Sequence, residues 1–306
     1  MKISIIGAGN VGSLTAMRIA QDGLGDVLLI DVVKHKARGE ALDLEDARPV
    51  LKYNYHIKGS DDIAEVRDSD IVVITAGLAR KPGMSREELL TKNAGILKDV
   101  CLKIKELAKR AIVIVVTNPL DIMTLYALRI TGFKPSKLFG MGISLDAARF
   151  ANLIAQELGI SCTDIEALVI GAHGEGMLPL PRFTKVKGVL LDEFIDDKKI
   201  ESLTARTIGR GAEIVATLGT GSAFFAPSAA IAAIVKAIVK DEKRTIGVCS
   251  YLDGEYGIKN TCIGVPCRLG KNGIEKVIEL DLSKEELAKL VKSGDLVASA
   301  QAQLPI

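Results

Sequence analysis

Three side chains that together could transfer a proton and bind a carboxylate lie near the middle of the sequence. Asp146 and Arg149 stand three residues apart, and His173 lies between glycines in Gly171-Ala172-His173-Gly174-Glu175. Residues three apart share one face of a helix, so a carboxylate and a guanidinium could meet an imidazole at one site. An imidazole titrates near neutral pH, and the planar arginine fork matches a carboxylate in two hydrogen bonds. A histidine that merely satisfies a turn is the alternative, and the helix-spaced pair favours the catalytic interpretation.

A second chemical signal stands near the N-terminus, where the apolar run Ile3-Ser4-Ile5-Ile6 leads into Gly7-Ala8-Gly9-Asn10-Val11-Gly12. This is the spacing of a turn that joins a strand to a helix and binds a dinucleotide. Gly7 would allow the turn, Gly9 would let the backbone approach a pyrophosphate, and Gly12 would let the helix pack closely on the strand. The six residues alone are a weak signal, because many α/β proteins contain glycine-rich turns.

The context strengthens the signal and indicates which dinucleotide binds. A second apolar run, Val27–Ile30, ends in Asp31, nineteen positions after Gly12, where a ribose-binding carboxylate is expected. A carboxylate accepts hydrogen bonds from a 2'-hydroxyl and repels a 2'-phosphate, so NAD is favoured over NADP. Lys34 and Lys36 stand close enough along the chain to keep NADP open as an alternative.

A basic segment, Leu78-Ala79-Arg80-Lys81-Pro82-Gly83-Met84-Ser85-Arg86, follows the apolar run Ile71–Thr75. Proline and glycine indicate a chain that bends here. A solvated basic loop is the ordinary interpretation of such a run. Because the segment follows a predicted strand above the dinucleotide crevice, we expect it to be a lid instead.

The elements that position these residues alternate through the first half of the chain. Apolar, β-rich runs at Val27–Ile30, Ile71–Thr75 and Ile112–Val116 are separated by stretches of mixed charge that are typical of helices. This alternation predicts an α/β fold in which a doubly wound parallel sheet of the Rossmann type carries helices on both faces. The loops after the strands, including Thr117-Asn118-Pro119, should converge on one crevice.

The alternation stops after Gly142, where we place the boundary between a dinucleotide-binding domain, residues 1–142, and an α+β substrate domain, residues 143–306. Ser144 is expected to cap a helix from Leu145 to about Leu158. Further predicted elements are a strand at Ile165–Ile170, helices at 197–218, 226–239 and 283–292, and strands at 246–251, 262–268 and 277–280. The helix at 226–239 is apolar on nearly every side, so we expect it to be buried in the core or against another subunit.

Composition narrows the class of protein. The chain has 306 residues, of which 48% are hydrophobic and 25% charged, and its net charge of +2 offers no case for nucleic acid binding. Five scattered cysteines without a C-x-x-C pair indicate reduced thiols and no metal cluster. We expect neither a signal peptide nor a membrane span, and therefore a cytoplasmic protein.

Several segments together resemble a malate dehydrogenase of the lactate dehydrogenase-like type over essentially the whole chain. They are Gly7–Gly12 with Asp31, 79–86, Asn118-Pro119-Leu120-Asp121, Leu145–Phe150, Gly171–Glu175, Leu218–Pro227 and Tyr251–Gly257. The chain departs from the pattern at Glu175 and Gly176, since many relatives carry Asp followed by Ser or Thr after the His-Gly pair.

The resemblance implies an NAD-dependent enzyme that interconverts (S)-malate and oxaloacetate, with a small dicarboxylate as its partner. His173 would be the acid/base, Asp146 its orienting group and Arg149 the ligand of the C1 carboxylate. The loop arginines would be Arg80 and Arg86. The resemblance also implies that Asn118 contacts the substrate and the nicotinamide ribose. It places the remaining cofactor contacts at Asn93, Val116 and Thr117, beside the glycine-rich turn and Asp31.

Two other functions stay open at this point. A lactate or other 2-hydroxy acid dehydrogenase would use the same residues on a monocarboxylate, and Arg80 decides against it, because a closed pocket would leave that cation unpaired. A non-catalytic NAD-binding sensor would keep the glycine-rich turn but would not need His173, Asp146 and Arg149. Relatives form dimers and tetramers, so a homodimer or homotetramer is expected.

Overall fold

The structure, a computed structural model, describes residues 1–78 and 85–304, with the backbone alone of Arg86. Its first half is a parallel six-stranded sheet in the order β3-β2-β1-β4-β5-β6. The strands are β1 (Lys2–Ile6), β2 (Asp26–Ile30), β3 (Ile57–Ser60), β4 (Ile71–Ile74), β5 (Ile112–Val115) and β6 (Leu138–Gly140). The register aligns Ile3 of β1 with Val27 of β2 on one side and with Ile71 of β4 on the other. The predicted doubly wound sheet is confirmed.

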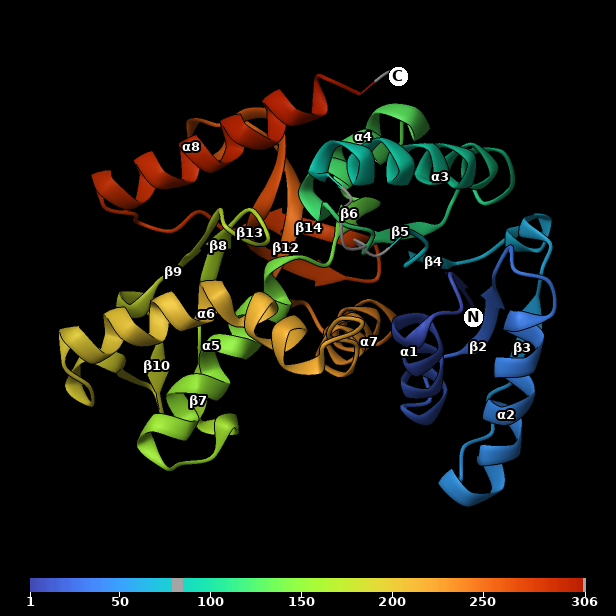
Figure 1. The fold of residues 1–306 in the computed structure, drawn as a ribbon, viewed down its shortest axis with the longest axis horizontal. Coiled ribbons are helices and arrows are strands. Elements are labelled where there is room, and N and C mark those ends of the chain that lie inside the picture. The colour runs from blue at the N-terminus through green and yellow to red at the C-terminus, as the bar shows by residue number, and fades with distance from the viewer. Residues whose placement is uncertain (79–84, 305–306) are drawn as a thin grey trace.

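Helices cover both faces of this sheet, which is why its central strands β4 and β5 are apolar at every position. The helices of this half are α1 (Asn10–Gln21), α2 (Lys36–Leu51), α3 (Arg86–Leu107) and α4 (Leu120–Thr131). Figure 1 shows α3 and α4 together on one side of the strands and α1 and α2 on the other. All four residues of β4 and of β5 are buried.

The second half extends the same sheet instead of forming a separate one. Gly140 of β6 is aligned with Cys249 of β12, and the order continues β12-β13-β8-β9, with β14 beside β13. These strands are β8 (Val169–Gly171), β9 (Met177–Pro179), β12 (Arg244–Asp253), β13 (Lys259–Gly270) and β14 (Gly273–Val277). A small sheet contains β7 (Ile165–Glu166), β10 (Lys185–Val186) and β11 (Val189–Leu190).

The helices of the second half are α5 (Ile143–Leu158), α6 (Asp197–Leu218), α7 (Phe225–Val239) and α8 (Lys284–Gln301). Short 3-10 helices are η1 (Ile63–Val66), η2 (Cys162–Asp164), η3 (Pro181–Phe183), η4 (Leu191–Glu193) and η5 (Glu255–Gly257). α7 packs against α1, and α8 packs against α4 and β13 (Figure 1). The apolar helix α7 is therefore largely buried within one chain, with Ile231, Ile234 and Val235 in the core.

Four local predictions were wrong. The single strand at Ile165–Ile170 is two strands in different sheets, because the N–H of Leu168 donates to the hydroxyl of Thr184 and not to a neighbouring strand. The last strand was predicted at 277–280, but β14 ends at Val277. The N–H of Ile278 still donates to the carbonyl of Pro266 on β13, but Pro266 has no N–H that could donate back to Ile278, so the strand pairing stops there.

The third concerns the start of α5. The residue that caps this helix is Gly142, and Ser144 lies inside the first turn, where its hydroxyl donates to the carbonyl of Met141. At the other end of the chain, α8 runs nine residues beyond the predicted Lys292. The helix runs close to the sheet at Gly294, where a Cβ would stand in van der Waals contact, 3.4 Å, with Thr261 of β13. Close packing on the sheet thus stabilises a segment of modest helical propensity.

The described residues form two apolar cores. The larger surrounds the long sheet and includes residues from both halves, among them Ile5, Val73, Ile234 and Ile263. The smaller lies between α5, α6 and the small sheet. In the described part of the chain, no helix is long and apolar enough to cross a membrane.

Candidate active site

The glycine-rich turn follows β1 and has the close contacts that its spacing predicts. Gly7 has a φ of +112°, and a Cβ there would stand 2.6 Å from the hydroxyl of Thr75. A Cβ at Gly12 would stand 1.9 Å from the carbonyl oxygen of Gly7, so α1 could not begin here with any larger residue. Both glycines are required by the backbone geometry.

Gly9 differs from its two neighbours, because its missing side chain leaves open space. A Cβ at Gly9 would meet no described atom within 4 Å. Gly9 is also the N-cap of α1; among the described residues no side chain caps this terminus, and the first turn contains no acidic residue. The free N–H groups of Asn10, Val11 and Gly12 and the positive end of the helix suit a pyrophosphate.

Asp31 directly follows β2, beside this turn. Its Oδ2 accepts a hydrogen bond of 2.8 Å from the N–H of Ala8, and its Oδ1 accepts one of 3.0 Å from the N–H of Val33. The Nζ of Lys36 lies 3.5 Å from Oδ2, and the carboxylate is 12% exposed. The carboxylate is therefore fixed at the edge of the site, where a ribose hydroxyl could reach it.

The opposite wall is the loop after β5. The hydroxyl of Thr117 donates to the carbonyl of Ala76 at 2.6 Å, which joins this loop to the one after β4. Val116 is half-buried, and Asn118 is exposed and precedes a cis peptide bond. The two loops thus form a continuous edge beside the glycine-rich turn.

Asn93 of α3 lies beneath that edge and is 1% exposed. Its Oδ1 accepts from the N–H of Leu78 at 2.8 Å, and its Nδ2 donates to the carbonyls of Leu78 and Asn118 at 3.2 and 2.8 Å. These bonds use both amide protons, so the structure presents Asn93 as a support for the loop that carries Asn118.

The three residues singled out for catalysis meet at the end of β8. Nδ1 of His173 lies 2.7 Å from Oδ2 of Asp146, and Nη1 of Arg149 donates to Oδ1 of the same carboxylate at 3.1 Å. Asp146 is fully buried in the first turn of α5. An ionised carboxylate can only accept, so the imidazole presents N–H at Nδ1 and leaves Nε2 for a substrate.

The surroundings of His173 favour its charged form. Burial lowers the pKa of its imidazole, but the charge and hydrogen bond of Asp146, with the charge of Asp121, outweigh burial and hold the pKa above the ordinary 6.5. Arg149 acts in the opposite direction. The ring can thus hold a proton near neutral pH and still release it.

Arg149 has donor capacity to spare. Its side chain is 11% exposed, and its Nε is buried with no hydrogen-bond partner among the described residues. The guanidinium lies beside Gly211 of α6, where a Cβ would stand 3.7 Å from Nη1 of Arg149. An unpartnered buried donor next to an acid/base suits an incoming carboxylate.

The loop arginines are placed only in part. Arg80 lies outside the described residues. Arg86 is the first residue of α3, so the helix begins at the end of the predicted basic loop. Ser85 accepts from the N–H of Glu88, and the Glu88 carboxylate accepts from the N–H of Ser85, a capping box that fixes this start.

Two residues near His173 were not singled out from the sequence. Asp121 of α4 accepts a hydrogen bond of 2.7 Å from the backbone N–H of His173, and burial raises the pKa of its carboxyl. Ser293 of α8 also bonds to the histidine loop, through the N–H of Ala172 and the carbonyl of Gly176. Asp121 belongs to Asn118–Asp121, one of the segments that carry the family resemblance, so this segment was a signal for it. No local sequence pattern distinguishes Ser293.

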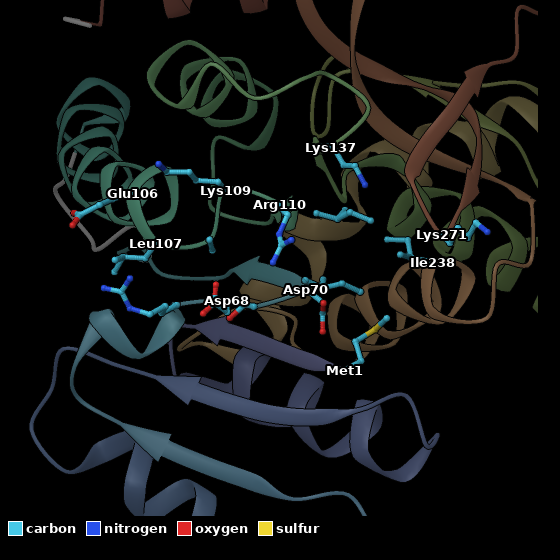
Figure 2. A pocket seen from close by; sticks show the side chains of 15 residues that line it. Met1, Asp68, Asp70, Glu106, Leu107, Lys109, Arg110, Lys137, Ile238 and Lys271 are labelled. Atoms are coloured by element: carbon cyan, nitrogen blue, oxygen red, sulfur yellow. The ribbon is translucent and has the colours of Figure 1, made fainter.

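A cavity of about 590 Å³ lies elsewhere, at the amino-terminal ends of β4 and β5 (Figure 2). Its charged lining is Arg67, Asp68, Asp70, Glu106, Lys109, Arg110, Lys137 and Lys271. Parallel sheets bind ligands at the carboxyl ends of their strands. The candidate site lies at those ends, so this cavity is separate from it.

Comparison with known proteins agrees with this geometry. The family model described as the lactate/malate dehydrogenase NAD binding domain matches residues 1–140, and the alpha/beta C-terminal domain of the same family matches residues 143–301. A malate dehydrogenase of Methanosarcina mazei is 48% identical over 306 residues, all of both chains.

Solved structures of the same family have the same fold over nearly the whole chain. The malate dehydrogenase of Salinibacter ruber has a TM-score of 0.94 and 41% identity, covering 99% of this chain and 98% of that one. A lactate dehydrogenase of Cryptosporidium parvum, solved with lactic acid and nicotinamide adenine dinucleotide, has a TM-score of 0.95 and 35% identity over 99% and 98% of the two chains. The fold, the glycine-rich turn and these full-length matches agree, and the chain belongs to the lactate/malate dehydrogenase family.

Proposed function

We propose that the protein is an NAD-dependent malate dehydrogenase that interconverts (S)-malate and oxaloacetate. The observation that carries this proposal is the buried carboxylate of Asp146, which pairs with His173 on one oxygen and with Arg149 on the other. A proton carrier and a carboxylate ligand are thereby held next to each other, as oxidation of a 2-hydroxy acid requires.

The cofactor would lie along the carboxyl ends of the strands. The backbone of Gly7–Gly12 would hold the pyrophosphate, Asp31 the adenosine ribose, and Val116, Thr117 and Asn118 the nicotinamide half. Asn93 would act through Asn118. NAD, when bound, supplies the acceptor for the hydride that leaves C2 of the substrate. Residues 1–142 would then form the dinucleotide-binding domain and residues 143–306 the substrate domain.

The chain's own residues would manage the proton and the charges. Nε2 of His173 would take the hydroxyl proton during malate oxidation and return it during oxaloacetate reduction. Asp146 would stabilise the imidazolium that forms. The guanidinium of Arg149 would bind the C1 carboxylate, Arg80 the distal one, and Arg86 and Asn118 would assist at the reacting end.

A lactate dehydrogenase is the second candidate, because the Cryptosporidium parvum enzyme has the same fold and was solved with lactic acid. The malate assignment is supported by full-length relatives at 48% and 47% identity that are malate dehydrogenases. It is also supported by Arg80, whose charge a methyl group would leave unpaired.

An absorbance assay at 340 nm with oxaloacetate and with pyruvate, each with NADH and with NADPH, tests this proposal. Faster turnover of oxaloacetate with NADH is expected. A higher kcat/KM for pyruvate would replace malate by lactate, and no oxidation of NADH with either acid would refute a dehydrogenase of this substrate class.

A homodimer or homotetramer belongs to the same proposal. No residue of α6 beyond Thr207 is fully buried, and Ile208, Val215 and Leu218 are exposed there. Exposed apolar side chains grouped on one helix are typical of subunit interfaces. Light scattering after gel filtration measures the mass of the assembly and so tests this proposal.

We further propose a cytoplasmic enzyme that carries out the malate step of the tricarboxylic acid cycle.

A further inference from the structure

The loop that carries His173 is tied to the C-terminal helix by one hydroxyl. Oγ of Ser293 accepts a hydrogen bond of 3.1 Å from the N–H of Ala172 and donates one of 2.9 Å to the carbonyl of Gly176. Ser293 is 4% exposed. One side chain thus joins the residue just before the histidine to the residue where the loop returns to β9.

The space around this hydroxyl is closed on the loop side. A Cβ at Gly176 would stand 2.7 Å from Oγ of Ser293 and 3.1 Å from Cβ of Ala172. Contacts under 3.0 Å require one of the groups to move. Gly176 and Ser293 are therefore sterically linked, because the hydroxyl occupies the place that a side chain at position 176 would take.

The two residues after the His-Gly pair are Glu175 and Gly176, and neither carries a hydroxyl. Here the hydroxyl that meets the loop comes from α8, more than a hundred residues further along the chain.

The histidine itself is held by two other groups. Its backbone N–H donates to Asp121 of α4 and its Nδ1 meets Asp146 of α5. Among the described residues, the charged or titratable groups that shift the pKa of the imidazole are Asp146 and Arg149 on α5 and Asp121 on α4, with the thiol of Cys249 behind Asp121. Glu175 is a further carboxylate on the loop itself, two residues after His173. Ser293 is uncharged, so its removal changes where the loop lies without changing this set of charges.

We propose that Ser293 is a positioning residue for the acid/base, a hydroxyl on α8 that holds loop 172–176 so that Nδ1 of His173 meets Asp146. This inference rests on the proposed dehydrogenase function for its kinetic test. It also has a readout that does not need turnover, since the chain has only three histidines and His35 and His56 are exposed.

The experiment compares four variants with the wild type: Ser293→Ala, Gly176→Ser, the double variant, and Ser299→Ala as the matched control. Ser299 is an exposed serine on the same helix. Each protein is assayed at a temperature below its melting point, KM for NADH is measured, and His173 is titrated by NMR.

We expect Ser293→Ala to lower kcat about 10- to 100-fold with KM for NADH unchanged, because small displacements of a reacting group are costly. The pKa of His173 should fall towards its ordinary value as the contact with Asp146 loosens. Gly176→Ser should show a similar loss, because its side chain meets the Ser293 hydroxyl. In the double variant the serine introduced at position 176 supplies a hydroxyl from the loop itself, so its kcat should recover to within about threefold of the wild type. The kcat of Ser299→Ala should match that of the wild type.

The proposal is overturned if Ser293→Ala keeps kcat within twofold and leaves the His173 titration unchanged. A lower melting temperature with unchanged kcat and titration would make Ser293 merely structural and would overturn it too. If the fold-loss of kcat in the double variant equals the product of the fold-losses in the two single variants, the steric link between Gly176 and Ser293 is refuted. If the wild type oxidises NADH with neither acid, the proposed function fails, and the titration still decides the role of Ser293.

Discussion

The carboxylate of Asp31, at the end of β2, accepts a hydrogen bond of 2.8 Å from the backbone N–H of Ala8 in the glycine-rich turn. The same carboxylate lies 3.5 Å from the ammonium group of Lys36. Asp31 therefore orders the turn, and the adjacent cation reduces the repulsion that Asp31 would exert on a phosphate.

From this relationship we predict that Lys36 weakens the preference for NADH over NADPH. Asp31→Ser should raise the ratio of kcat/KM for NADPH to that for NADH about tenfold or more, because the repelling charge is gone while the lysine remains. Lys36→Gln should lower the ratio below that of the wild type. Lys34→Gln is the control, since among the described residues the ion pair of Asp31 is with Lys36 and not with Lys34. Equal ratios in all variants would contradict the assignment of the ribose site.

A second prediction concerns the acid/base. His173→Asn should bind NADH with nearly unchanged affinity, measured by fluorescence, but lose about 10²–10⁴-fold or more in kcat, since a positioned acid/base contributes that much. The Asn side chain can still donate to Asp146, so the fold should survive. A variant that keeps most of its activity would make the histidine structural and would favour the NAD-binding sensor.

The third prediction follows from the raised pKa of His173. Reduction of oxaloacetate needs the imidazolium, so kcat/KM should be constant at low pH and fall as pH rises through a pKa above 6.5. Oxidation of malate needs the neutral ring and should rise through the same pKa. The stability contributed by the imidazolium is fully present below the unfolded pKa and is lost as pH rises through the folded one.

Asp121→Asn tests the contribution of Asp121 to the raised pKa of His173. The amide oxygen of Asn can still accept a hydrogen bond from the backbone N–H of His173, but the negative charge that helps to raise the pKa of the imidazole is removed. Both pH profiles should move to lower pH in this variant. Profiles that do not move would show that Asp121 supports only the backbone.

The fourth prediction concerns substrate choice. Arg80→Gln should lower kcat/KM for oxaloacetate at least about 10²-fold, because burying a carboxylate without its partner costs about 3–5 kcal/mol. It should at the same time improve pyruvate, which brings only a methyl group. Arg149→Lys should impair both acids, since an ammonium group cannot replace the two-point guanidinium contact. An unchanged ratio of oxaloacetate to pyruvate in Arg80→Gln would remove Arg80 from substrate recognition.

The parts of the fold that the sequence predicted well are those where a local pattern suffices. Runs such as Ile112–Val115 are apolar throughout because both faces of the strand are covered, and a short apolar run between turn residues is visible without knowledge of its partners. The glycines of the turn could also be predicted from a local pattern. A side chain at Gly12 would collide with Gly7, five residues earlier, and a side chain at Gly7 would collide with Thr75, which directly follows the adjacent strand β4.

The predictions that failed depend on distant partners. Whether Ile165–Ile170 is one strand or two is decided by Thr184, and the end of β14 by Pro266 on the neighbouring strand. Neither partner is recognisable from the segment itself, because pairing register is a property of two segments.

The sequence by itself determined the fold class and the set of chemical groups: a glycine-rich turn with Asp31, and a carboxylate, a guanidinium and a histidine in helix and loop spacing. Only the tertiary structure decided how they are held. It placed Oδ2 of Asp146 2.7 Å from Nδ1 of His173, and it brought Asp121 of α4 and Ser293 of α8 into hydrogen-bond contact with the loop between β8 and β9. The reason is physical: types and short spacings are local properties of a chain, whereas the hydrogen bonds that orient a catalytic group join residues brought together by packing of the core.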